Sequence, residues 1–177
     1  LRPPVIMALL KLFKKLPQHI FVSRLPRLLA VICDGLKNRD SDARDMARTT
    51  LAKMAVELDI TFLADIVREL AVTLTEGYQL HVRAAAIHSI LLQLSVVYKP
   101  PILSGEDGGG TLLLLFDKTV PALMDLVQQA LFGVAQERKE AADNGRYVKE
   151  AGGSKSAHSI VVISSMILFK SSKAGTK

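Results

Sequence analysis

This sequence has little cysteine, no tryptophan and no long apolar run. A single cysteine, Cys33, cannot form an internal disulfide, and no set of Cys and His residues has metal-ligand spacing. We therefore expect a reducing, intracellular compartment and no bound metal or other cofactor. Apolar stretches such as residues 160–169 are well short of the about 20 residues that span a bilayer, so we predict no membrane segment and no membrane partner.

Aromatic residues are also scarce, at 5% of the chain, whereas hydrophobic residues of all kinds reach 49%. Most of these are Leu, Ala, Val and Ile, a composition that favours helices packed on helices. A compact chain of 177 residues has enough apolar surface to form a core. The chain starts at Leu1 without a secretory cleavage site, so we expect it to begin inside a longer protein.

The net charge is +6, but the charges are unevenly distributed. Residues 1–58 contain 11 Lys or Arg and 5 Asp or Glu, residues 59–136 contain 4 and 8, and residues 137–177 contain 8 and 4. The two basic ends permit contact with phosphate groups. The solvated surface of a moderately basic protein accounts for the same distribution, and the sequence leaves both interpretations open.

Two apolar patterns recur along the chain and predict two kinds of helix. The first, i, i+3, i+4, i+7, i+11, forms three apolar stripes: Leu25, Leu28, Leu29, Ile32 and Leu36; Leu63, Ile66, Val67, Leu70 and Leu74; and Val120, Leu123, Met124, Val127 and Leu131. The second, i, i+4, i+8, forms three alanine triplets at a shift of 39 residues: Ala8, Leu12 and Leu16; Ala47, Leu51 and Ala55; and Ala86, Ile90 and Leu94.

Alternation of the two patterns at about 40 residues is typical of HEAT or armadillo repeats. We therefore predict an all-α protein with a HEAT/armadillo-type right-handed α-solenoid, in which each helical pair buries its apolar face against the next pair. The expected divisions are HEAT-type helical repeats over 1–98, a Pro/Gly-rich insertion over 99–111, a further helical repeat over 112–144, and a polar linker with an uncertain C-terminal helix over 145–177.

The C-terminal part is the least regular. Residues 133–159 are polar and broken by glycine, so we expect little packed core there. The apolar residues 160–169 fit either a last capping helix or a docked strand, and the sequence does not decide between them.

The charged stretch that follows Gly35 is predicted to be the turn between two helices of one pair. Ser41 is a suitable N-cap, and Asp42 in the first turn suits the positive end of a helix. Arg44 and Arg83 correspond at the 39-residue shift, near the starts of two triplet helices. We predict that they form a structural ladder between adjacent repeats, with contact to a partner as the alternative.

No group of residues predicts an active site. The sequence GEDGGGT at 105–111 lacks the Gly-Lys-Ser/Thr that holds phosphate in a P-loop. His81 and His88 share a helical face but have no third ligand, and Cys33 is expected to pack inside a helix pair. We therefore predict no catalytic, cofactor-binding or metal-binding residue, and an enzyme centred on Cys33 or the histidines would have to show turnover lost in Cys33→Ala.

Basic residues on three successive helices are the better candidates for contacts with RNA or a partner: Lys11, Lys14, Lys15, Arg24, Arg27, Arg48 and Lys53. If they line one edge of the solenoid, they would follow an RNA backbone through salt-sensitive contacts. No aromatic stacking residues accompany them, so we do not predict sequence-specific recognition of single strands. Solvated helix faces are the alternative interpretation.

Three separated motifs carry a resemblance to a known family. They are RDMARTTLAKMAVEL at 44–58, IVRELAVTLTEGYQLHV at 66–82 followed by His88, and LFGVAQERKE at 131–140. Together they resemble the C-terminal region of the U3 small-nucleolar-RNA-associated protein 20 family, over roughly residues 20 to 142. The family pattern is less well matched in the last 35 residues and in the Gly-rich insertion.

The resemblance implies a non-enzymatic HEAT-repeat scaffold of the small-subunit processome, the 90S pre-ribosome of the nucleolus. It also implies processome proteins and the U3 small nucleolar ribonucleoprotein as partners, pre-rRNA as a further one, and a role in pre-18S rRNA processing and 40S subunit biogenesis. No small-molecule substrate is expected. The alternative is a HEAT-repeat adaptor or nuclear transport receptor that binds peptide segments.

Overall fold

The computed structural model describes residues 3–75, 77–98, 109–132 and 153–167, and every regular element in these ranges is helical. The elements are α1 (Pro3–Phe13), α2 (Gln18–Gly35), α3 (Ser41–Leu58), the 3-10 turn η1 (Ile60–Phe62), α4 (Leu63–Thr73), α5 (Gln79–Val97), α6 (Gly109–Phe132) and α8 (Gly153–Met166). The predicted all-α class is therefore confirmed for the described residues.

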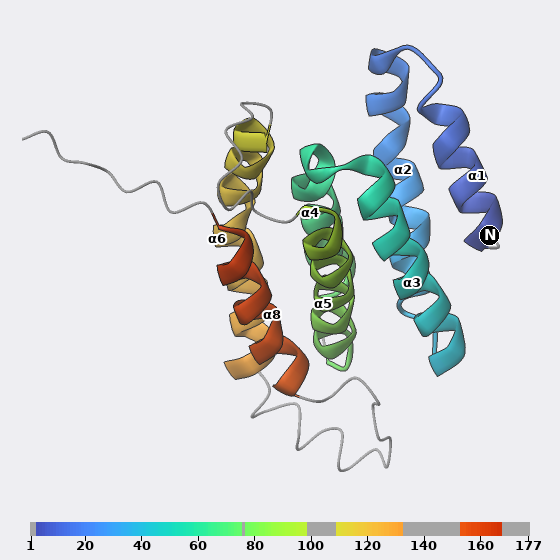
Figure 1. The fold of residues 1–177 in the computed structure, drawn as a ribbon. Helices are drawn as coiled ribbons and strands as arrows, with labels where there is room; N and C mark the ends of the chain where they lie inside the picture. The colour runs from blue at the N-terminus through green and yellow to red at the C-terminus, as the bar shows by residue number, and fades with distance from the viewer. Residues whose placement is uncertain (1–2, 76, 99–108, 133–152, 168–177) are drawn as a thin grey trace, which may run out of the picture.

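The helices are arranged in two rows. In the α5 row, α1 contacts α3, α3 contacts α5, and α5 contacts α8; in the α4 row, α2 contacts α4 and α4 contacts α6. The rows are joined where α2 packs on α3, α4 on α5 and α6 on α8. Figure 1 shows these pairs following one another across the view, from α1 at the right to α6 and α8 at the left.

The apolar stripes form the contacts between and within the pairs. Every residue of the first two stripes is buried, from Leu25 to Leu36 and from Leu63 to Leu74. In the third stripe Leu123 and Val127 are buried, and the other three members are partly buried against the same core. One continuous hydrophobic cluster therefore runs through the described helices.

The alanine triplets differ in burial, and one prediction is wrong. The triplets of α3 and α5 are buried, at 5% exposure or less. In α1, by contrast, Ala8 is exposed and Leu12 is 56% exposed, and Leu16, which lies beyond the end of α1 at Phe13, is 38% exposed. Helix α1 packs on α2 and α3 through a different face that contains Ile6 and Leu10. The spacing identified the helix, but no described helix covers its triplet.

The turn between α2 and α3 brings these helices unusually close. A Cβ added at Gly35 would lie 3.2 Å from Cβ of Ala47, so a larger residue there would press on the triplet of α3. The N-cap of α3 is Asp40, whose side chain accepts a hydrogen bond from the backbone N of Asp42, and not Ser41 as predicted. Asp42 occupies the first turn as expected.

The last two described helices refine the expectations for the C-terminal part. Helix α6 begins at Gly109, within the expected insertion, and residues 133–144 of the expected repeat lie outside the described residues. The segment that fitted a helix or a strand belongs to α8 through residue 166, and this helix packs on α5 and α6.

The expectation of little packed core before residue 160 is wrong at the start of α8. Ser156 and Ser159 are 4% and 0% exposed. The Ser159 hydroxyl donates to the carbonyl of Lys155 at 2.9 Å, so its polar group is satisfied within the helix and the side chain can be buried. A serine-rich segment therefore packs here as core.

Helix α5 has the length and apolar composition of a membrane span, with a mean hydropathy of 1.5 over its best window. Half of that window is buried inside the protein, where α5 lies between α3 and α8. Packing on both sides accounts for a helix that is apolar over most of its circumference.

Candidate partner-binding surfaces

The basic residues at the end of α1 form a contact with the end of α3. Lys14 Nζ donates to the backbone carbonyl of Glu57 at 2.7 Å and to its carboxylate Oε1 at 2.9 Å. The hydrogen bond from Lys14 lowers the pKa of Glu57, and the charge of Lys11 acts in the same direction. All three lysines are exposed to solvent, and Lys14 is also engaged in this contact within the protein.

The remaining basic candidates lie in both rows. Arg24 and Arg27 are exposed on α2, in the α4 row, and Lys53 is exposed on α3, in the α5 row. Arg48, also on α3, forms an ion pair of 2.9 Å with Asp45 one turn earlier, and its side chain is only 20% exposed. The structure thus distributes the seven candidates over both rows.

Arg44 and Arg83 are both buried, at 7% and 3% exposure, and both donate to the turn that precedes their helix. Arg44 Nη1 donates to the carbonyls of Asn38 and Arg39 at 3.1 and 3.0 Å. Arg83 Nη1 donates to the carbonyl of Leu74 at 2.9 Å, and its Nη2 donates to Gln129 Oε1 at 2.7 Å.

The contact between Arg83 and Gln129 joins α5 to α6, so this arginine connects one helical pair to the next. The hydrogen bonds of Arg44 to Asn38 and Arg39 hold the turn within its own pair. Both side chains supply donors to backbone carbonyls that lie outside the helices, and these hydrogen bonds reduce the cost of burying a charged guanidinium.

The motif residues Leu74, Thr75, Gly77 and Tyr78 lie between α4 and α5, and Gln79 is the first residue of α5. Gly77 has a φ of 54°, in the left-handed region that glycine favours. Tyr78 Oη donates to the carbonyl of Lys37 at 2.8 Å, and Gln79 Oε1 accepts from the backbone N of Thr75 at 3.3 Å. The motif therefore connects its own turn to the turn between α2 and α3.

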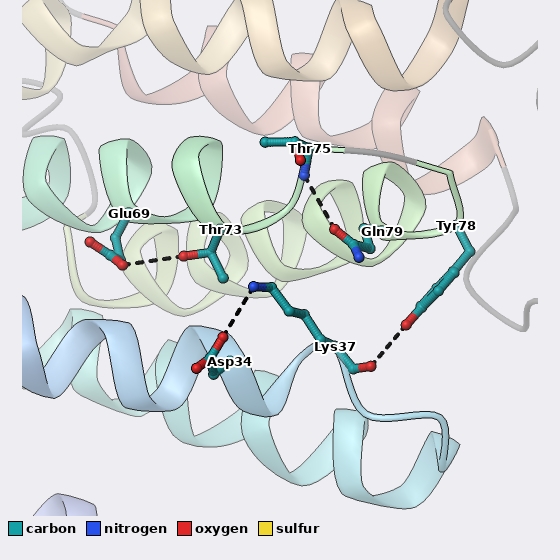
Figure 2. A network of polar contacts seen from close by, with 7 residues as sticks. All are labelled: Asp34, Lys37, Glu69, Thr73, Thr75, Tyr78 and Gln79. Carbon is teal, nitrogen blue, oxygen red and sulfur yellow. Dashed lines mark hydrogen bonds and ion pairs between the residues drawn. The ribbon is translucent and has the colours of Figure 1, made fainter.

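Figure 2 shows these contacts together with two short-range polar pairs on the neighbouring helices. Lys37 Nζ lies 3.1 Å from Asp34 Oδ1, and the Thr73 hydroxyl donates to Glu69 Oε1 at 3.2 Å. Exposed pairs of this kind contribute little to stability. They do give this edge both charged and neutral groups for contact with a partner.

A pair of histidines joins α5 to α8 in the α5 row. His88 Nε2 and His158 Nδ1 are 2.9 Å apart, and the ring centroids are 5.1 Å apart. Burial lowers the pKa of His88, and the charges of His158, Lys155 and Arg48 lower it further. This pair could not be predicted from the sequence, because the two residues are 70 positions apart and no spacing rule connects them.

Cys33 is fully buried, and its thiol is held in the protonated form. Burial raises the pKa of Cys33 to about 12, and the negative charges of Glu69 and Asp34 contribute in the same direction. Among the described residues, no three or more His, Cys, Asp or Glu side chains are grouped as metal ligands. The candidate functional sites of the described residues are therefore the exposed surfaces of the two rows.

Comparison with known proteins gives consistent results. A family model described as the U3 small nucleolar RNA-associated protein 20 domain matches residues 1–174. U3 small nucleolar RNA-associated protein 20 of Saccharomyces cerevisiae is 28% identical over 166 residues, which cover 94% of this chain and 6% of that protein. The Schizosaccharomyces pombe protein of the same name is 29% identical over 171 residues, which cover 97% of this chain and 6% of that protein.

Proposed function

The chain belongs to the U3 small nucleolar RNA-associated protein 20 family, and we propose that it acts as one length of a non-enzymatic scaffold in the small-subunit processome. In this role it supports pre-18S rRNA processing and 40S subunit biogenesis in the nucleolus, through contacts with processome proteins, the U3 small nucleolar ribonucleoprotein and pre-rRNA. The chain spans about 6% of the length of the curated relatives it matches, so it would contribute one segment of a much longer molecule.

The observation that carries this proposal is the repetition of one helical pair. Helices α2 with α3, α4 with α5, and α6 with α8 pack in the same order, and each pair shares a continuous apolar cluster with the next. Such pairs expose a surface that grows with every repeat, which suits a protein that holds several partners at once. We propose that the pairs form a right-handed solenoid of the HEAT type.

Within this scaffold we propose different roles for the two groups of basic residues. Arg44 and Arg83 form the structural ladder, because they are buried and donate hydrogen bonds to backbone carbonyls and, in the case of Arg83, to Gln129. The exposed members of the other group, Lys11, Lys15 and Lys53 among them, remain available for RNA or a protein partner. Their charge would add affinity without sequence preference.

Affinity purification of the intact protein from growing cells tests the proposal. We expect U3 RNA, pre-18S rRNA and processome proteins to be recovered, and crosslinks mapped to single residues to fall on exposed positions of both rows. Recovery of neither U3 RNA nor processome proteins would overturn the proposal. Enrichment of nuclear-pore proteins or peptide cargo without pre-rRNA would indicate an adaptor or transport receptor instead.

A further inference from the structure

Three helices of the α5 row bring positive groups together around His88. The ring of His88 lies against that of His158, with Nε2 and Nδ1 2.9 Å apart, so α5 and α8 meet at this point. Lys155 is one turn before His158 on α8, and Arg48 lies on the neighbouring α3. The charges of Lys155 and Arg48 both lower the pKa of His88, which places these cations within electrostatic reach of the ring.

Among the residues that the structure describes, negative charge is scarce around this cluster. Helices α5 and α8 contain no Asp or Glu at all. Asp45 forms an ion pair with Arg48, and Lys155 has no carboxylate within ion-pair distance among the described residues. Among the described residues Arg48 therefore has a counterion and Lys155 has none, and an anion bound beside Lys155 would supply it.

The hydrogen-bonding groups of the cluster suit phosphate oxygens. Lysine and arginine donate charge-assisted hydrogen bonds to phosphate. A neutral histidine carries one N–H, so the pairing of His88 Nε2 with His158 Nδ1 leaves one N–H donor on the outer nitrogens of the pair, and protonation of the pair adds a second. His158 is exposed to solvent. These donors come from successive helices along the row, and a chain of linked phosphates can reach all of them in turn.

We propose that Arg48, His88, Lys155 and His158 form a binding site for the phosphate backbone of RNA, on the face of the α5 row where α3, α5 and α8 adjoin. The choice of RNA over other polyanions rests on the proposed function. None of the four residues is Phe, Tyr or Trp, and the two imidazole rings pack on each other, so the site reads charge and backbone, and not base identity.

The test measures binding of a fluorescently labelled single-stranded RNA to the full 177-residue chain by anisotropy, over a series of salt concentrations. Lys155→Glu should weaken binding about tenfold and lower the salt slope, since each lost phosphate contact removes about 0.7 from the slope for a single strand. Arg48→Glu should act in the same way. Wild-type affinity and salt slope in both variants would overturn the proposal.

Arg68→Glu is the matched control for Arg48→Glu. Arg68 pairs with Asp65 one turn earlier, as Arg48 pairs with Asp45, but it lies on α4 in the other row and its side chain is 70% exposed. Both substitutions therefore reverse one charge and break one ion pair of the same spacing. An equal loss of RNA binding in Arg68→Glu would show a general effect of net charge and would contradict a localised site.

Two further measurements keep the proposal testable if charge reversal disturbs folding. His158→Arg adds a fixed positive charge and should tighten RNA binding several-fold, and unchanged or weaker binding would contradict the site. In the unmodified chain, nuclear magnetic resonance titration of the histidine rings should show that RNA raises the pKa of His88. An unchanged pKa would also contradict it.

Competitors distinguish the source of the anion. RNA should displace the probe, whereas inorganic phosphate and polyglutamate should displace it only at far higher concentration. Displacement by polyglutamate as readily as by RNA would indicate an acidic protein partner in place of RNA. Binding of inorganic phosphate alone would indicate a site for free phosphate and not for a macromolecule. If the variants bind RNA in vitro as the original chain does, while U3 RNA is still recovered from cells, the proposed site is refuted and the proposed function stands.

Discussion

Helices α1 and α3 have the same triplet spacing but opposite exposure. Leu12 and Leu51 are equivalent at the 39-residue shift, yet Leu12 is 56% exposed and Leu51 is 0% exposed. Helix α3 contacts α1, α2, α4 and α5, whereas α1 contacts only α2 and α3 among the described helices to any extent. An apolar face specified by sequence is therefore buried only where a neighbouring helix covers it.

A second difference lies at the start of each helix. Arg44 of α3 corresponds to Val5 of α1, which is 46% exposed. Helix α3 is therefore connected to the turn before it by two hydrogen bonds from Arg44, and α1 has no equivalent side chain. The comparison indicates that a buried helix of this kind combines an apolar face with side-chain hydrogen bonds to the turn before it.

The largest expected effect comes from removing the buried leucine. Leu51→Ala should lower the free energy of unfolding by about 2–5 kcal/mol, because it leaves a cavity in the core. Leu12→Ala should change it by less than about 0.5 kcal/mol, because the side chain is already exposed. Urea denaturation followed by circular dichroism measures both. Equal losses would mean that the triplet of α1 is covered in solution, and the comparison would fail.

The next effect concerns the connection to the turn. Arg44→Met keeps most of the apolar stem but removes two charged hydrogen bonds, and it should cost about 1.5–3 kcal/mol. Val5→Met at the equivalent position of α1 should be nearly neutral. The same denaturation experiment provides both values. If Arg44→Met left the free energy of unfolding unchanged, the turn would be held by other contacts and the two helices would not differ in this respect.

A smaller effect is expected where turns of successive pairs meet. Tyr78→Phe removes the hydrogen bond to the carbonyl of Lys37 and keeps the ring, so it should cost about 0.5 kcal/mol. The difference between the original chain and Tyr78→Phe isolates the hydroxyl, and Tyr78→Leu, which also removes the ring, isolates the contribution of the ring by comparison with Tyr78→Phe. If Tyr78→Phe is as stable as the original chain in denaturation, the hydrogen bond to Lys37 makes no measurable contribution to the contact between the pairs.

The smallest effect is confined to acidic pH and extends the comparison to the contact between α5 and α8. The pKa of His88 is lowered from 6.5, so the unfolded chain binds this proton more readily than the folded chain. Stability should therefore be constant with respect to this group above pH 6.5 and decrease as the pH falls through 6.5 toward the lowered pKa.

Thermal unfolding at several pH values measures this dependence. His88→Gln should weaken it, whereas His19→Gln, an exposed residue on α2, should leave it as it is. The charged groups that act on His88 are His158, Lys155 and Arg48, and all of them oppose its protonation. The same pH dependence in His88→Gln as in the original chain would show that the histidine contact is not the source.

Sequence analysis predicted the elements that depend on local periodicity. The stripes that begin at Leu25 and Leu63 are buried as expected, because neighbouring helices cover the apolar faces of α2 and α4. The triplet of α1 was predicted wrongly by the same argument, since exposure depends on which helix lies beside it. The N-cap was misplaced by one residue because Asp40 and Ser41 are both good caps.

Contacts between distant segments were beyond the reach of the sequence. Buried Ser159 looked unsuitable for a core, and only its hydrogen bond to the Lys155 carbonyl explains its burial. The pair of His88 and His158 needs the stacking of α8 on α5, which no local pattern specifies. The turn contact of Tyr78 was partly signalled, because Tyr78 lies in one of the three family motifs.

The buried thiol of Cys33 gives this protein a built-in reporter. It is the single cysteine of the chain, it is inaccessible in the closed structure, and its pKa of about 12 keeps it unreactive at neutral pH. An alkylating reagent can therefore modify it only while α2 is transiently separated from its neighbours. The labelling rate at this native cysteine would measure how often α2 separates from its neighbours, without any engineered probe.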